Sequence, residues 1–598
     1  MKRLKIISLL FLLGLSTSIC AVKESDMQAE IQRVLQNIDQ EKALKSYKEF
    51  LELNEKGFLN SVLSVFGGVL SVAEGLAYTL LTPVQQVIKL ALPAITENPY
   101  RNLKATVRCG DPICEPELLF RDKRLIFVKE AQEKMLSMEL EPEDVLEIGF
   151  SHSGGGWRAM LCAIGSCAGA DKIGLLNCAM NISGLSGSTW FIAPWVYSGL
   201  HIEYYRERAI KVASEGIDLQ SFSEITPLLD SLLVKFAYSE PLNIVDLYGG
   251  LLANSLFRGL KDDPHRAYVS AQRENVMSGR YPFPVYTATL GERMKDEFWF
   301  EFTPFEVGSR WLNAYVPTWA FGRHFKRGVS KDYAPEQSTG FLCAIFGSAF
   351  AADFEDLYET MIQGLEIPSF MEYIPFGSQI FDAIKQVVER LAYTDFGDLR
   401  IAWSRVPNFV YKMHGMPHSS YKELRLVDAG LDFNNPVFVT YRKPPYGDAP
   451  DIIFIFDAGA TVEFKEVQAL VDYAKYHGLK FPKIEPYEVD KHVISVFKDD
   501  DDIEVPVVVY MPRLNGLSLL MRNNYKGWYD YYLDLLDGFD IDQACSSGFA
   551  DTFNFDYTKR EAETIVAMTE FNVISVSNKI KEIMKERIEA KRKFRNKK

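Results

Sequence analysis

The chain has 598 residues, of which 47% are apolar and 13% aromatic, so it contains enough apolar material for a large packed core. This composition is typical of a globular protein and excludes a disordered or fibrous one. The net charge of −14 excludes nucleic acid as the main partner, because binding it requires a dominant basic surface.

The N-terminus has the order of a secretory signal peptide. Basic residues at positions 2, 3 and 5 precede an apolar run from Ile6 to Leu15, and small residues follow at 16–18. This pattern predicts a signal peptide over 1–21, and therefore an exported protein that is secreted, periplasmic or lumenal, or membrane-associated. A lipoprotein signal ending at Cys20 and an uncleaved membrane anchor are the alternatives.

Export would allow cysteines to pair. Cys109 and Cys114 are close enough in the sequence to predict a small disulfide loop. Cys162, Cys167 and Cys178 lie among apolar residues, so we expect them to be buried. No cysteine spacing indicates a zinc site.

Residues 22–99 are predicted to form a helical, apolar N-terminal segment. The stretch 58–95 is almost free of charge, and it fits a membrane-dipping hairpin, an interfacial helix or a buried hairpin about equally well. From about residue 100, strand patterns alternate with helical patterns, which predicts an α/β catalytic domain over 100–590. Residues 591–598 form a basic tail, expected to be solvated or to contact anionic lipid.

Three adjacent glycines occupy a turn between a predicted strand and a predicted helix. "VLEIGF" (145–150) indicates a buried strand, and "WRAMLCAIGSCAGA" (157–170) indicates an apolar helix. Bare amides and the positive end of the helix dipole gather in such a turn. Neither a phosphate-loop pattern nor a dinucleotide-binding pattern fits the glycines. The turn is therefore predicted to stabilise an anion in another way.

The next strand–helix turn contains a candidate nucleophile. "CAMNIS" (178–183) predicts a strand, and the following "GLSGSTW" places Ser186 in a pattern close to a nucleophile elbow. None of the eight histidines lies in a compelling position for a base. Asp428 and Asp457 each end an apolar strand, and chain physics alone does not choose between them.

Three motifs together resemble one known family. "SGGGWRAM" (153–160), "GLSGSTW" (184–190) and "VDAGLDFNNP" (427–436) are similar to the catalytic domain of the cytosolic phospholipase A2 group, shared with the lysophospholipase (phospholipase B) enzymes. The resemblance covers roughly 100–590 in a consistent order. It implies a patatin-like α/β fold, with a three-layer mixed central sheet flanked by helices and a cap or lid insertion. We expect this cap at about 310–420, with 370–381 as a lid.

The resemblance also implies a Ser-Asp dyad without histidine. In this sequence Ser186 would be the nucleophile and Asp428 the base, while Gly155 and Gly156 would donate the oxyanion-hole amides. Arg158 would hold the lipid phosphate, since its planar guanidinium suits that group; a salt bridge at the start of the helix is the alternative. Asp457 would then be structural.

The implied function is a lipid acyl hydrolase that cleaves fatty-acyl esters of phospholipids or lysophospholipids at a membrane surface through an acyl-serine. An esterase or transacylase acting on other glycerolipids, and a lipid-binding scaffold, are the alternatives. The family's dyad requires no metal or other cofactor. The first hundred residues lack the pattern of a C2 β-sandwich, so calcium-driven recruitment by a C2 domain is not expected.

Overall fold

The computed structural model describes a set of residue ranges that includes most of the predicted catalytic domain: 85, 89, 92–217, 225–261, 263–291, 299–350, 403–431, 434–444, 447–460, 464–484, 492–515 and 551–597. The predicted signal peptide, most of the predicted N-terminal segment and the predicted lid at 370–381 lie outside these residues. Within them, no helix combines the length and hydropathy that crossing a bilayer requires.

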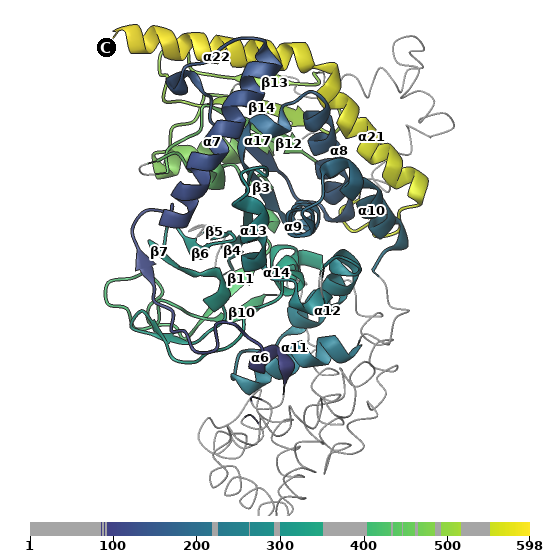
Figure 1. Cartoon of the computed structure of the whole chain (residues 1–598), viewed down its shortest axis with the longest axis vertical. Coiled ribbons are helices and arrows are strands. Elements are labelled where there is room, and N and C mark those ends of the chain that lie inside the picture. The colour runs from purple at the N-terminus through teal and green to yellow at the C-terminus, as the bar shows by residue number, and fades with distance from the viewer. Residues whose placement is uncertain are drawn as a thin grey trace, which may run out of the picture.

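A large mixed sheet forms the centre of the molecule (Figure 1). Its strands occur in the order β1-β7-β6-β5-β4-β3-β2-β12-β14-β13, and β11 pairs with both β10 and β4. The neighbours from β4 through β3, β2 and β12 to β14 are parallel, and the outer pairs are antiparallel. The bounds are β1 Arg108–Cys109, β2 Ile148–His152, β3 Ala179–Leu185, β4 Phe283–Leu290, β5 Trp299–Phe302, β6 Glu306–Ser309, β7 Ala314–Pro317, β10 Ser404–Pro407, β11 Glu423–Val427, β12 Ile452–Asp457, β13 Ser495–Phe497 and β14 Val507–Pro512.

Helices cover both faces of this sheet and complete three layers. Figure 1 shows α7 (Glu115–Leu136) on one side, and α8 (Gly156–Lys172), α10 (Ile202–Glu215) and α21 (Lys559–Ser575) on the other. Because helices cover both faces, every residue of β2, β3, β4, β12 and β14 is buried. The remaining helices are α6 Pro93–Thr96, α9 Thr189–Ser198, α11 Ile225–Ala237, α12 Ile244–Phe257, α13 Arg273–Val276, α14 Thr339–Phe346, α17 Phe464–His477 and α22 Ser577–Lys597. This architecture confirms the predicted α/β class.

The basic C-terminus is part of a helix and holds buried carboxylates. Arg592 and Arg595 donate to Asp144 at 2.6 and 2.8 Å, and Lys591 donates to Asp451 at 2.9 Å. Both aspartates are almost fully buried, so the pairs fix the end of α22 against the body. The prediction of a solvated or lipid-contacting tail thus missed the structural role of these three cations.

The predicted disulfide is wrong. Cys109 and Cys114 are both free: Cys109 is exposed in β1, whereas Cys114 is buried where α7 begins. Nearness in the sequence does not set the direction of a side chain, and these two have different environments. Cys162, Cys167 and Cys178 are buried, as predicted, and desolvation raises the pKa of the Cys162 thiol to about 11.

The described parts of the predicted cap are closely connected to the body. β7 pairs with β1 and β6 in the central sheet, and α14 packs against α12. Residues 351–402, the middle of the predicted cap, lie outside the described ranges. The cap itself stays a prediction.

Candidate active site

Ser186 and Asp428 meet because two strands end against the same edge of β4. β3 runs parallel to β4, and its last residue, Leu185, lies opposite Thr287. β11 approaches from the other direction, and its last residue, Val427, lies opposite Thr289. Ser186 follows Leu185 and Asp428 follows Val427, so these two residues lie close together beside β4.

The Ser186 hydroxyl donates a hydrogen bond to Asp428 Oδ2 at 2.8 Å. Both residues are 2% exposed. Ser186 has a φ of 51°, a left-handed conformation that costs a residue with a Cβ on the order of 1–3 kcal/mol and often marks a functional turn. The turn is followed at once by α9, so the serine occupies the sharp strand-to-helix bend that its motif predicted.

Two further contacts hold the Asp428 carboxylate in place. The Gly430 amide donates to Asp428 Oδ1 at 2.9 Å, and the Asp428 amide donates to Ser348 Oγ at 3.1 Å. Oδ1 is thus occupied by the backbone while Oδ2 faces the serine. The sequence patterns alone predicted no role for Ser348.

The glycine turn packs directly against this elbow. A Cβ added at Gly187 would lie only 2.0 Å from the Gly156 carbonyl oxygen and 2.8 Å from the Gly156 nitrogen. Gly155 and Gly156 have φ values of 130° and 57°, which side chains rarely adopt. Among the described residues, neither of their amides has a hydrogen-bond acceptor. The Gly156 nitrogen thus lies close to Gly187, the residue after Ser186.

Asn434 joins the glycine turn to the loop that carries Asp428. The Gly154 amide donates to Asn434 Oδ1 at 3.0 Å, and Asn434 Nδ2 donates back to the Gly154 carbonyl at 3.3 Å. Asn434 itself is anchored because its amide donates to Glu466 at 3.0 Å. Asn434 lies in the motif "VDAGLDFNNP", but the sequence alone predicted no role for it. Only the fold brings it to Gly154, 280 residues away.

Arg158 lies at the start of α8, behind the glycine turn. Its Nε donates to the Ala458 carbonyl at 2.6 Å, and Nη2 donates to Thr552 Oγ1 at 3.2 Å. Burial, and then the charge of nearby Arg513, lower the pKa of Arg158. The charge of Asp457 acts on Arg158 in the opposite direction, so the two guanidinium groups are partly compensated.

Asp457 belongs to a different part of the sheet. β12 ends beside β2, with Phe456 opposite His152, so β2 separates Asp457 from the strand that carries Ser186. Its carboxylate accepts hydrogen bonds from Ser153 Oγ at 3.1 Å and from the Tyr510 hydroxyl.

The histidines lie elsewhere or are buried in neutral form. His152 precedes the glycine turn, and desolvation lowers its pKa to about 3. Its Nε2 lies 3.5 Å from Cys167 Sγ. His414 and His418 lie in the turn-rich connection between β10 and β11. Within the described ranges, no histidine is hydrogen-bonded to Ser186.

Solved structures of a cytosolic phospholipase A2 share this fold. Human GIVD cytosolic phospholipase A2 matches with a TM-score of 0.66 and 22% identity, over 81% of this chain and 66% of that one. The same protein in complex with Methyl gamma-Linolenyl Fluorophosphonate matches with a TM-score of 0.62, 23% identity and the same coverage. At this level of identity the likeness shows the fold.

The sequence comparisons identify the family. The family model for the lysophospholipase catalytic domain matches residues 148–480, and the chain belongs to this family. Cytosolic phospholipase A2 zeta of Mus musculus is 26% identical, over 81% of this chain and 63% of the relative. Cytosolic phospholipase A2 delta of Homo sapiens is 25% identical, over 78% and 62%. The chain thus spans less than two thirds of the length of these relatives.

These relatives contradict the predicted localisation. The zeta, delta and epsilon phospholipases A2 that the chain matches are all cytosolic by name. The prediction of an exported protein, whether secreted, periplasmic, lumenal or membrane-associated, is therefore wrong. A basic stretch before an apolar run is a short compositional pattern that carries no information about the catalytic domain that follows.

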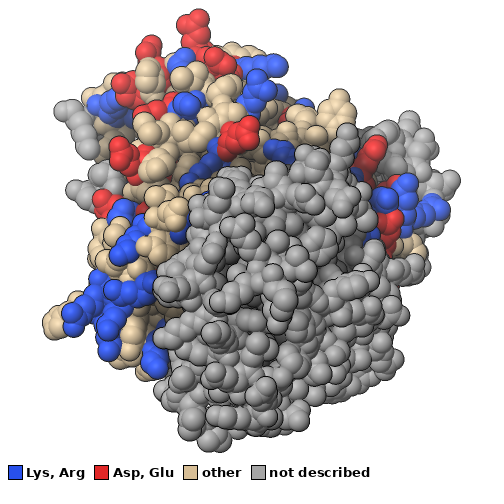
Figure 2. Space-filling model, turned by 60° about the horizontal axis from the view of Figure 1, so that its bottom comes forward, with Lys and Arg blue, Asp and Glu red and all other residues tan. Residues whose placement is uncertain are grey.

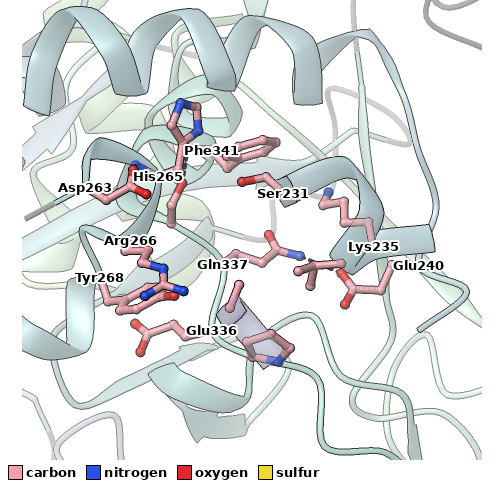
Figure 3. Close-up of a pocket in the computed structure, with 14 residues that line it drawn as sticks. Ser231, Lys235, Glu240, Asp263, His265, Arg266, Tyr268, Glu336, Gln337 and Phe341 are labelled. Atoms are coloured by element: carbon pink, nitrogen blue, oxygen red, sulfur yellow. Dashed lines mark hydrogen bonds between the residues drawn. The ribbon is translucent and has the colours of Figure 1, made fainter. Parts of the chain in front are cut away.

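A separate cavity of about 50 Å³, lined by both polar and apolar residues, lies between α6, α11 and the loop before α14 (Figure 3). Neither Ser186 nor Asp428 lines it. Two glutamates in its wall are almost fully buried. Desolvation raises the pKa of Glu240 to about 8 and that of Glu336 to about 7, although Lys235 partly opposes the shift at Glu240. Both carboxyl groups are therefore partly protonated near pH 7.

The raised pKa of Glu240 predicts a pH-dependent stability. A carboxyl whose pKa is higher in the folded state favours folding below its ordinary pKa of 4.5, and this contribution is lost as the pH rises through about 8. We therefore expect Glu240→Gln to raise the free energy of unfolding relative to the wild type, by an amount that grows between about pH 5 and about pH 8. Urea denaturation at both pH values measures it, and a constant difference would contradict the prediction. Exposed Glu274→Gln is the control.

Proposed function

We propose that this protein hydrolyses fatty-acyl esters of phospholipids and lysophospholipids through an acyl-serine intermediate. The observation that carries the proposal is the 2.8 Å hydrogen bond from Ser186 to Asp428, made beside the amides of Gly155 and Gly156. A buried hydroxyl, a carboxylate base and two unoccupied amides are the parts that acyl transfer requires.

In the proposed reaction, Asp428 Oδ2 accepts the Ser186 proton while Oγ attacks the ester carbonyl. The resulting oxyanion is stabilised by the amides of Gly155 and Gly156. The C–O bond then breaks, and the departing lipid alkoxide receives the proton from Asp428. In the second half, Asp428 takes a proton from water, which attacks the acyl-serine. The fatty acid leaves, and Ser186 regains its proton from Asp428.

Contacts of Asn434 support a positioning role in this reaction. Its side chain accepts from the Gly154 N–H and donates to the Gly154 carbonyl, and it belongs to the loop that carries Asp428. The distance between the base and the oxyanion-hole amides is thus constrained by one side chain.

Arg158, reinforced by Arg513, is proposed to attract the lipid phosphate. A salt bridge at the start of the helix is the alternative role for Arg158.

Aromatic side chains beside the glycine turn suit the acyl chain. Phe350 Cζ lies 3.4 Å from where a Gly156 Cβ would be, and the ring packs against Trp190 and Phe555. Phe553, 52% exposed, contacts the same ring and extends the apolar surface to solvent. An apolar path from the surface to the reacting serine is consistent with a long-chain ester.

A basic surface supports a phospholipid surface as the source of substrate. This surface is formed by the segments around residues 105, 327–330 and 411, which backbone hydrogen bonds join. The Arg327 amide donates to the Tyr411 carbonyl, and the Ser330 amide donates to the Ala105 carbonyl, both at 2.9 Å. Figure 2 shows Lys and Arg side chains gathered on the left of the molecule, despite the net charge of −14. Anionic phosphates are attracted to such a face. The exposed cations of these segments are Arg101, Lys104, Lys326, Arg327, Lys331, Lys412, Lys422 and Arg425.

Fatty-acid release from defined lipids tests the proposal. Phosphatidylcholine vesicles, lysophosphatidylcholine micelles and a triacylglycerol emulsion are compared, each with calcium or with a chelator. We expect release from the two phosphate-bearing lipids, with no requirement for calcium. Release from triacylglycerol alone would favour an esterase of other glycerolipids. Absence of both release and Ser186 labelling by Methyl gamma-Linolenyl Fluorophosphonate would favour a lipid-binding scaffold.

A further inference from the structure

Helix α7 has a second apolar face, which points away from the sheet. Its buried residues recur every three or four positions, as a helix packed on a sheet requires. On the opposite face, Leu119 is 54% exposed and Ile126 is 61% exposed. Leu118 and Phe127, at 41% and 38%, flank this pair. Because α7 forms the outer layer on its side of the sheet (Figure 1), these side chains indicate a contact surface.

One acidic and one basic residue lie between these apolar side chains. Asp122 and Lys123 are both exposed, and they fall between Leu119 and Ile126 on the outer face of the helix. Asp122 forms no salt bridge within the described ranges. The described contact of Lys123 is a long one, 3.5 Å from Nζ to the Met277 carbonyl. The face therefore presents two apolar side chains with one charge of each sign between them.

The order of these residues makes the face complementary to itself. Leu119 and Ile126 are equally far from the midpoint between Asp122 and Lys123. When two such helices pack antiparallel about a two-fold axis through this midpoint, Leu119 lies opposite Ile126 of the second copy. Asp122 then lies opposite Lys123 of the second copy. Each contact occurs twice, as a two-fold interface requires, and the pairs of unlike charge fix the register.

The charges at the ends of this face limit the length of the contact. Glu115 and Glu130 would face one another in the same antiparallel arrangement. Helices of the commonest packing class cross at about 50°, which separates these carboxylates and confines close contact to the turns around 119–126. We propose that this face of α7 binds the same face of a second copy of the chain, so that the protein forms a two-fold dimer. The three acidic residues, Asp122 among them, make an anionic membrane a poorer partner. The proposal does not depend on the proposed lipase activity.

Sedimentation velocity of the full chain tests the proposal. A contact of this size lies at the small end of specific interfaces, so we expect a Kd on the order of 10 µM, which concentrations from about 1 to about 100 µM bracket. Ile126→Lys should weaken dimerisation at least about 10-fold, because the two-fold contact then buries two unpaired charges. Tyr204→Lys is the matched control, since Tyr204 is 76% exposed on α10, and it should leave the affinity unchanged. Ser186→Ala should dimerise as the wild type does.

Exchange of the two central charges tests the antiparallel register. Asp122→Lys alone and Lys123→Asp alone should each weaken dimerisation about 10-fold, because each creates two contacts between like charges. The double variant should recover the wild-type affinity, and an equal mixture of the two single variants should form heterodimers. Circular dichroism verifies that each variant is folded. The proposal is overturned by a wild type that stays monomeric at about 100 µM, by a dimer that Ile126→Lys leaves unchanged, or by a double variant as weak as the single ones.

Discussion

Asp428→Asn is expected to abolish fatty-acid release, whereas Asp457→Asn should leave most of it intact. Among the described residues, Asp428 is the carboxylate that accepts a hydrogen bond from the Ser186 hydroxyl, and an amide in its place cannot act as a base. We expect kcat on phosphatidylcholine vesicles to fall by a factor on the order of 10⁴ in Asp428→Asn, and by a similar factor in Ser186→Ala.

Asp457→Asn serves as the matched control, because it makes the same chemical change at another buried carboxylate. That carboxylate accepts hydrogen bonds from Ser153 and Tyr510, so its loss should lower the free energy of unfolding by about 1–3 kcal/mol. Labelling by the fluorophosphonate should be lost in Asp428→Asn and kept in Asp457→Asn. Full activity in Asp428→Asn, or selective loss in Asp457→Asn, would show that the wrong aspartate had been chosen.

Arg442→Met is expected to destabilise the protein more than Asp457→Asn does. Arg442 is 2% exposed; its Nε donates to Glu117 at 2.6 Å, and the guanidinium also pairs with Glu301. The contact joins α7 to β5 across the core. Removing the cation would leave two carboxylates buried and uncompensated, which should lower the free energy of unfolding by about 3–5 kcal/mol. Urea denaturation followed by tryptophan fluorescence measures it.

Two companions make this result specific. Arg405→Met removes an exposed arginine that lies 3.7 Å from Glu423, and it should cost less than about 1 kcal/mol. A triple variant with Arg442→Met, Glu117→Leu and Glu301→Leu should recover most of the stability, because no charge is then left unpaired. An Arg442→Met protein as stable as the wild type would show that the buried carboxylates are compensated in another way.

The local parts of the site could be predicted from the sequence because they depend on neighbouring residues. A strand, a tight turn and a helix that follow one another place Ser186 and the glycine amides without reference to the rest of the chain. The predicted strands 145–150 and 178–183 appear as β2 and β3, displaced by only a few residues.

What could not be predicted depends on long-range register and on side-chain direction. The pattern left Asp428 and Asp457 equivalent; they differ because β11, which precedes Asp428, pairs with the end of β4, whereas β12, which ends at Asp457, pairs with β2. Ser348 and Asn434 become meaningful only when distant loops meet. The disulfide prediction assumed that two nearby cysteines face one another, and the structure buries one and exposes the other.

The meeting of β3 and β11 on β4 also has a consequence for synthesis on the ribosome. The serine and the aspartate are 242 residues apart, and the serine emerges first. A nascent chain that ends before β11 carries an elbow and a glycine turn, but it has no group to accept the proton. If the proposed dyad is correct, such a chain, or a fragment released early, does not hydrolyse lipids. The proposed activity would then require that β11 has been made, has returned to the sheet and has aligned in register with β4.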